Sequence, residues 1–284
     1  MDKELAVINR NLVVDGMPVR VLHLRLDEKG MVHLEILTDL RERYALVEEL
    51  RRSNRAEAIE HPATKREKRR NEIEFDWPEP LRDTESVEIG GVRFEVRGCS
   101  GRSAQPGWRR YDFRMRGTFE ALPQTDGPLR IIREPKEVKF LAETPVTLTV
   151  GEGVQRIEDG SGRWVNILEV GITDILELWE RHEMDDRRRA QQEEVCPCGM
   201  GFLTLVYECP EDLTPEFCTA DWLAEAPKGN SGMGLIVQVP KERGPNGLPL
   251  RPASVEGAVP LDAKTIRAEL FSWEKKEDQP DILL

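Results

Sequence analysis

The first forty residues alternate between apolar and polar side chains, which is the pattern of half-buried β-strands. Apolar runs at residues 12–14 and 19–26 flank a short turn at residues 15–18. A second turn leads into the apolar run 31–37. Because alternating runs joined by Asp- and Gly-containing turns form hairpins, we predict a three- or four-stranded antiparallel sheet over residues 5–37.

The spacing of apolar residues becomes helical after this sheet. Between Leu40 and Leu50 apolar side chains recur at steps of four and three residues, which places them on one helix face. Asp39, with Glu42 three residues later, fits a capping box at the helix start. We predict a helix over residues 39–60. The following residues, 62–84, are polar and contain three prolines, and we interpret them as a linker or exposed loop.

Short strands return in residues 85–170. A hairpin is expected around Gly90-Gly91, and in the strand after it Tyr111 and Phe113 share one face while Asp112 and its polar neighbours take the other. Further strands are expected at residues 129–133, 137–142, 145–150, 154–157 and 164–170. Regularly spaced short strands separated by glycine and proline turns are typical of a sandwich or barrel.

A second helix is expected over residues 172–194. Its first two turns carry an apolar stripe, formed by Ile172, Ile175, Leu176 and Trp179. Residues 183–194 are polar on all sides, which is typical of a solvated helical arm. Towards the C-terminus we expect one more strand at residues 233–239 and a short helix within residues 261–275.

Composition and charge narrow the range of partners. Charged residues make up 33% of the 284-residue chain, above the about 25% of an average globular protein. The formal net charge of −12 is unevenly spread: residues 171–230 carry −9, whereas residues 41–70 and 91–120 each carry +4. No apolar run approaches the about 20 residues that span a bilayer, and the N-terminus has no signal-peptide pattern. We therefore expect no membrane contact and a location in the cytoplasm or a virion.

The acidic block contains four of the five cysteines: Cys196, Cys198, Cys209 and Cys218. Four thiolates within 23 residues suit a tetrahedral zinc site. The string Cys-Pro-Cys-Gly-Met-Gly resembles the opening of some small zinc-binding motifs of the form C-P-C-G-x-G. Four thiolates leave no open coordination position, so a zinc ion here would be structural. We predict a zinc knuckle whose acidic surroundings favour contact with a protein rather than with nucleic acid.

Eight residues separate Cys209 from Cys218, unlike the close pair that ends such motifs, and this spacing leaves other readings of the cysteines open. The run 202–208, between the two pairs, reads as a strand. A second reading is that the cysteines are reduced, partly buried thiols. A Cys196–Cys198 redox pair is a third reading, although a one-residue gap strains a disulfide. His182 is a further candidate ligand if its helix folds back.

Two basic islands are candidate nucleic-acid contacts. The first lies within residues 51–70, where the charges are equally typical of a solvated loop. The second combines arginines with an aromatic ring, a mixture that can grip phosphates and stack on bases: Arg102, Trp108, Arg109, Arg110, Arg114 and Arg116. Alternating arginines are also typical of the solvent-exposed face of a half-buried strand.

Signatures of enzymes are sparse. Nucleophile-elbow, zinc-protease and phosphate-loop motifs are missing from the sequence. Glu137-Val138-Lys139, with Asp126 eleven residues before it, resembles the core of nucleases of the PD-(D/E)xK type. That resemblance implies that two carboxylates hold Mg²⁺ and a lysine orients the attacking water. In a chain this rich in charge, however, a Glu-x-Lys triplet arises easily by chance.

These patterns predict a mainly β (α+β) protein: antiparallel sheets in a sandwich or barrel, two main helices and a small zinc-knuckle module. We divide it into N-terminal strands plus helix (1–61), a linker (62–84), a β-rich domain (85–170), an acidic helical arm with the cysteine module (171–230), and a C-terminal strand and tail (231–284).

For function, we predict a non-enzymatic structural or assembly subunit of a homo- or hetero-oligomer, by analogy with viral or phage-tail-like particles. The alternative is a metal-dependent nuclease or a nucleic-acid-binding adaptor.

Overall fold

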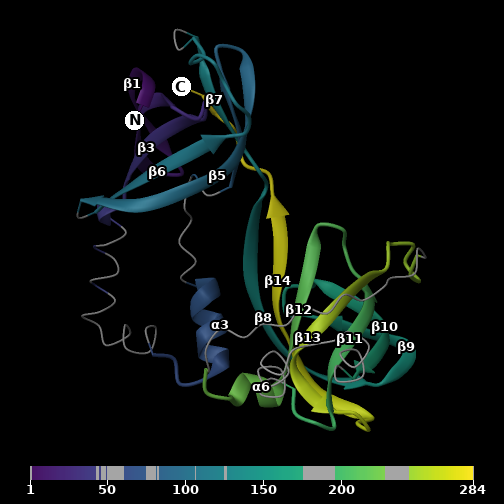
Figure 1. The fold of residues 1–284 in the computed structure, drawn as a ribbon. Coiled ribbons are helices and arrows are strands. Elements are labelled where there is room, and N and C mark those ends of the chain that lie inside the picture. The colour runs from purple at the N-terminus through teal and green to yellow at the C-terminus, as the bar shows by residue number, and fades with distance from the viewer. Residues whose placement is uncertain are drawn as a thin grey trace. The chain divides into compact units, whose positions relative to one another are not determined.

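The structure is a computed structural model that describes residues 2–42, 61–74, 83–105, 107–124, 127–174, 196–227 and 243–283, together with the single positions 45, 49 and 81. In these residues the protein is mainly β, with a nearly closed antiparallel barrel, a half-barrel sheet and two helices (Figure 1). The predicted class and the barrel alternative are thereby confirmed. None of the described helices is long and apolar enough to cross a membrane.

The chain divides into two compact units. Unit 1 comprises residues 1–57, 77–136 and 277–284, and unit 2 comprises residues 58–76 and 137–276. We describe each unit by itself.

Unit 1 contains eight strands in one sheet. In chain order they are β1 (Asp2–Val14), β2 (Met17–Asp27), β3 (Val32–Asp39), β4 (Thr84–Ile89), β5 (Val92–Gln105), β6 (Trp108–Met115), β7 (Leu129–Arg133) and β15 (Ile282–Leu283). Their order in the sheet is β1-β2-β3-β6-β5-β4-β7-β15. Inward-facing side chains such as Leu24, Leu34 and Phe113 form one apolar core. The hairpins expected over residues 5–37 and around Gly90-Gly91 are present.

The described residues of unit 2 form seven strands in a second sheet. They are β8 (Lys136–Thr149), β9 (Gly151–Glu158), β10 (Trp164–Thr173), β11 (Met200–Glu208), β12 (Leu213–Thr219), β13 (Arg251–Pro260) and β14 (Thr265–Glu277), in the order β8-β14-β12-β13-β11-β10-β9. The inner face carries the main core, with Leu205, Phe217 and Trp273 among its residues. Successive strand residues point to opposite faces, so Cys218 and Phe271 face outward and form a smaller cluster.

Among its described residues, unit 2 has the helices α3 (Lys65–Glu74) and α6 (Ala220–Ala224). Helix α3 falls within residues 62–84, which the sequence analysis interpreted as a linker or exposed loop, so that interpretation is wrong for this stretch. The Thr64 hydroxyl accepts from the Glu67 backbone N–H at 3.2 Å, and the Glu67 carboxylate accepts from the Ala63 N–H at 2.7 Å. These contacts form a capping arrangement of the T-x-x-E kind that starts the helix.

The predicted C-terminal helix is also wrong. Residues 265–277 form strand β14, whose inward residues Ile266, Ala268 and Leu270 join the core of unit 2. Packing on the sheet therefore outweighs the helix propensity of its Ala, Glu and Lys residues. Strands expected at 137–142 and 145–150 form the single strand β8.

Other predictions fall largely on residues that the structure does not describe. The helix expected over 39–60 lies mostly among them, although the Asp39 carboxylate accepts from the Arg41 backbone N–H at 3.0 Å, as an N-cap residue does. Of the arm expected over 172–194, Ile172 and Thr173 end strand β10, and residues 175–195 lie outside the described residues. The strand at 233–239 lies outside them as well.

Candidate interaction surfaces

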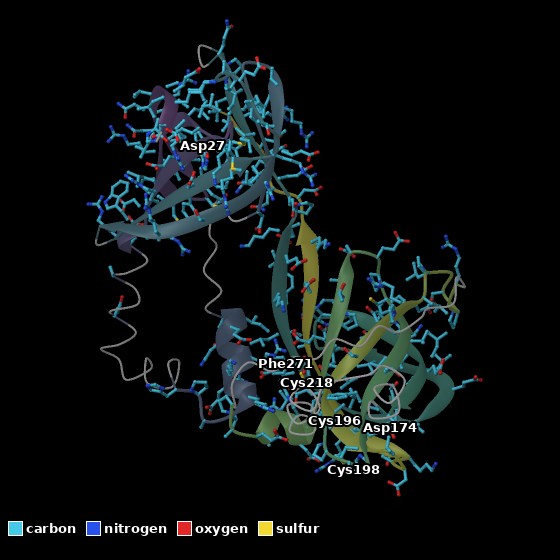
Figure 2. All side chains as sticks on the ribbon, viewed as in Figure 1. Asp27, Asp174, Cys196, Cys198, Cys218 and Phe271 are labelled. Atoms are coloured by element: carbon cyan, nitrogen blue, oxygen red, sulfur yellow. The ribbon has the colours of Figure 1, made fainter. Side chains whose placement is uncertain are left out.

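The structure does not bring the four cysteines of the predicted zinc knuckle together. Cys196 and Cys198 precede strand β11, and Cys209 follows its last residue. A nine-residue strand separates its ends by about 30 Å. Cys218 lies on the outer face of β12 beside Phe271 (Figure 2), whereas Cys209 belongs to the inner core. In the described part of the chain no three His, Cys, Asp or Glu side chains form a group that could hold a metal ion.

The individual cysteines differ in accessibility. Cys198 is exposed and Cys196 is buried, where burial and the nearby Asp174 carboxylate raise the pKa of its thiol. Cys209 donates a hydrogen bond of 3.1 Å to the Leu213 carbonyl, and burial raises the pKa of its thiol to about 11. Burial likewise raises the pKa of Cys218. Because the thiolate is the nucleophilic form of cysteine, burial lowers the reactivity of these three thiols. His182 lies outside the described residues.

The second basic island is split between the two faces of the unit 1 sheet. Arg102 and Arg110 are direct cross-strand neighbours on the outer face, and Arg114 shares that face two pairs further along. Arg116 instead pairs with Glu95 at 2.9 Å. Arg109 lies over the ring of Tyr111 at 5.4 Å from the centroid. The aromatic Trp108 is covered by Arg41, at 5.7 Å.

A polar network that sequence reasoning did not assemble lies beside these arginines. The His33 imidazole is buried, with Nδ1 3.0 Å from Asp112 Oδ1 and Nε2 3.5 Å from Asp27 Oδ2. Arg25 donates to Asp112 at 2.9 Å. Hydrogen bonds from the Met31 backbone N–H and its neighbours keep the pKa of Asp27 below its ordinary value. The four side chains come from three strands, so the network ties β2, β3 and β6 together.

The outer face of unit 2 carries a cluster of carboxylates. Glu256, Cys218 and Glu269 are lateral neighbours on β13, β12 and β14. Glu216 lies two residues before Cys218, and Glu143 comes from β8. We call these four glutamates, 143, 216, 256 and 269, the acidic face. Burial raises the pKa of Glu256 despite the nearby Arg69, and the Glu216 carboxylate acts in the same direction as burial.

Helix α3 lies on the acidic face and contacts it through arginines. Arg66 donates two hydrogen bonds to the Glu269 carboxylate, at 2.6 and 2.5 Å. Arg70 binds Glu143 through Nη2 at 2.6 Å to each oxygen. Hydrogen bonding to these carboxylates raises the pKa of both guanidinium groups. The first basic island therefore has carboxylate partners in its own chain, at least for these two arginines.

Two further residues of α3, Arg69 and Lys65, also contact carboxylates. Arg69 lies 3.5 Å from Glu216 and 3.4 Å from Glu256. Lys65 pairs with Glu225 at 2.8 Å, and its ammonium lies 4.6 Å from the centroid of the Trp222 ring. Bidentate arginine–carboxylate pairs and cation–π contacts are directional and stronger than isolated surface pairs.

Strand β1 ends the sheet of unit 1. Within the described residues it pairs with β2 alone. Its outward side chains Leu5, Val7 and Val13 are exposed by 56%, 72% and 69%. Its inward residues Ile8 and Leu12 only partly reach the core. A long edge strand with apolar side chains on both faces is a template for another strand.

Comparison of the chain with protein-family models, with curated proteins and with solved structures finds no match in any of the three.

Proposed function

We propose that this chain is a non-enzymatic assembly subunit that joins another protein chain through the edge strand β1. The supporting observation is the row of exposed apolar residues on a thirteen-residue strand whose second edge no described strand pairs. The stretch Leu5–Ile8 carries no charge. Proteins that remain monomeric usually protect such an edge with charges, prolines, bulges or a covering segment. Strand β1 has register shifts at Asp2/Glu4 and at Val7/Arg10, and its first residues contact residues 120–122. The proposal therefore rests on the uncharged stretch Leu5–Ile8.

The partner that we propose for the open edge of β1 is the β1 strand of a second copy of this chain. Two β1 strands paired antiparallel about a two-fold axis would present identical contacts to each other. The added strand would bond to the outer backbone groups of β1 and extend the sheet. It would also cover Ile8 and Leu12, which the core of one copy leaves half-buried.

The test is sedimentation velocity at physiological salt from about 1 to about 100 µM, a range that brackets micromolar association. We expect a monomer–dimer equilibrium, and we expect Val7→Lys to weaken it about tenfold or more, because like charges meet across the symmetric pair. Val92→Lys is the matched control: Val92 is 54% exposed but lies on β5, which has a strand on each side. The proposal would be contradicted by a wild-type chain that stays monomeric over this whole concentration range. It would also be contradicted if Val7→Lys associated as strongly as the wild type.

Nucleic-acid binding is the second candidate, and one observation favours it. Arg102 and Arg110 are directly opposite each other on the outer face of unit 1. Glu35, 3.2 Å from Arg110 Nε, balances part of this positive charge, and a phosphate group would balance the rest. Binding to DNA or RNA that weakens steeply with salt and is lost in Arg102→Ser would support this function instead.

The nuclease alternative has less support from the positions of its residues. Glu137 and Lys139 lie at alternate positions of β8, and the Lys139 ammonium is 3.8 Å from Glu274. Asp126 lies outside the described residues. Incubation with DNA or RNA and Mg²⁺ tests it: cleavage that disappears in Glu137→Ala would replace the assembly proposal with an enzymatic one.

A further inference from the structure

Helix α3 packs against unit 2 with charged residues where a helix usually places apolar ones. Arg66, Arg69, Arg70 and Ile73 stand at positions i, i+3, i+4 and i+7, the spacing of the face that normally meets a core. Ile73 is the apolar residue of this face, and it packs against the small cluster of Cys218, Leu223 and Phe271. No residue of the helix is fully buried.

The forces that hold α3 are therefore mainly ionic. The side chains of Arg66, Arg69 and Arg70 remain 37%, 28% and 43% exposed, whereas the Glu269 side chain is 6% exposed. Salt therefore reaches the arginine side of these part-buried pairs and weakens their attraction, since the screening length falls from about 10 Å at 0.1 M to about 3 Å at 1 M. A helix docked by an apolar stripe would respond to salt in the opposite sense, because salts that are excluded from protein surfaces strengthen burial.

We propose that α3 is a detachable ionic latch, which closes over the acidic face and over Cys218 and opens when its ion pairs are screened or neutralised. In the closed state Cys218 is fully buried. Opening removes Arg69 and Ile73 from the outer face and gives solvent a route to the thiol. The proposal is independent of the edge strand β1, which belongs to unit 1.

Cys218 can report opening of the latch, and Cys209 can serve as the control for unfolding. Cys218 lies on the outer face under α3, whereas Cys209 lies in the inner core of the same unit. Labelling with N-ethylmaleimide, read for each cysteine by peptide mass spectrometry, therefore separates latch opening from unfolding of unit 2. We expect the labelling rate of Cys218 to rise about tenfold or more between 0.05 and 1 M NaCl, from screening of several pairs together. The rate of Cys209 should stay constant.

Variants test whether the latch is ionic. Arg66→Gln with Arg70→Gln removes the pairs to Glu269 and Glu143 and should give rapid Cys218 labelling already at low salt. Arg267→Gln is the matched control, because it removes another surface pair of unit 2, to Asp221 at 3.0 Å, and leaves the acidic face unchanged. It should leave Cys218 protected.

A peptide added in trans tests whether the contact is separable. A synthetic peptide of residues 62–76 should restore protection of Cys218 in the full-length Arg66→Gln/Arg70→Gln chain at low salt. The same peptide with both glutamines should fail. Any of three results would contradict the latch proposal. The labelling rate of Cys218 could be unchanged by salt, the rates of Cys218 and Cys209 could rise in parallel, or the wild-type peptide could fail to protect Cys218.

Discussion

The Trp273 indole Nε1 donates a hydrogen bond of 2.9 Å to Oδ2 of Asp159, and both side chains are buried in unit 2. Asp159 also accepts from the backbone N–H groups of Ser161 and Arg163, at 2.8 and 3.0 Å, and from Arg163 Nε at 2.7 Å. One carboxylate thus receives four donors. It joins the turn after β9 to β14 in the middle of the core.

Replacing this carboxylate should destabilise unit 2. In Asp159→Asn an amide NH₂ group faces donors that need an acceptor, so we expect a loss of about 1–3 kcal/mol in the free energy of unfolding. Glu158→Gln is the control: Glu158 is exposed and lies 3.7 Å from Arg156, and its change should be small. Urea unfolding followed by circular dichroism compares them, and equal midpoints for the two variants would contradict the hub role of Asp159.

The same carboxylate predicts how acid acts on unit 2. Burial alone would raise the pKa of Asp159, but the hydrogen bonds from Arg163 and Ser161 outweigh it and hold the pKa below the ordinary 3.8. Since the folded state binds this proton less readily than the unfolded state, the stabilisation is present above about pH 4 and is lost as pH falls through the depressed pKa. We expect the difference between wild type and Asp159→Asn to shrink between about pH 6 and about pH 3. A difference that stays constant across this range would refute the assignment.

Arg133 should be sensitive to a substitution that keeps its charge. It is 2% exposed, binds Asp15 at 2.7 Å through Nη1, and donates to the Pro280 carbonyl at 3.0 and 2.8 Å through Nε and Nη2. Lysine cannot reproduce this fork of donors. We expect Arg133→Lys to lower the stability of unit 1 by about 1–3 kcal/mol in urea unfolding.

Arg130, three residues before Arg133 on β7, is the control for this change. Arg130 is 46% exposed and pairs with Asp281, so Arg130→Lys should cost about 1 kcal/mol or less. If both lysine variants unfold at the same urea concentration, the buried fork has no special role in holding the C-terminal segment.

Removing one member of the Arg102–Arg110 pair should stabilise unit 1. Like charges directly opposite each other on neighbouring strands repel, although Glu35, 3.2 Å from Arg110 Nε, offsets part of this repulsion. Threonine fits a strand well, so Arg102→Thr is expected to gain up to about 1 kcal/mol. Arg93→Thr on the same strand is the control, because it removes an ion pair with Glu85 at 2.9 Å and relieves no repulsion. Thermal unfolding in low salt measures both, and a lower midpoint for Arg102→Thr than for wild type would contradict the repulsion.

The sequence was most informative where structure is set locally. Alternation of apolar residues and the turn at Gly90-Gly91 are properties of adjacent residues, so the hairpins of unit 1 could be predicted. Strand β14 could not, because what decides it is packing against β12 in the fold rather than the propensity of its own residues.

Helix α3 shows a second kind of limit. Its contact face consists of arginines, so a search for an apolar stripe passes over it, and its partners Glu143 and Glu269 lie far away in the sequence. One local signal was available: Thr64 and Glu67 have the spacing of a capping box. The nine-residue length of β11 was equally informative about the cysteines, because a strand of that length separates the residues at its ends.

Thiol reactivity and metal content test the predicted zinc knuckle against the positions of the cysteines in the structure. From the exposures, Cys99 and Cys198 should react with a thiol reagent at once in the native protein, and Cys196, Cys209 and Cys218 only slowly or after unfolding. Purified protein should then contain no zinc held by all four predicted ligands, because β11 keeps Cys198 and Cys209 at opposite ends. Thiol titration together with metal analysis by mass spectrometry checks both statements. About one zinc ion per chain that is lost in Cys196→Ala would instead establish the knuckle, and it would require the segment before β11 to fold back along the whole strand.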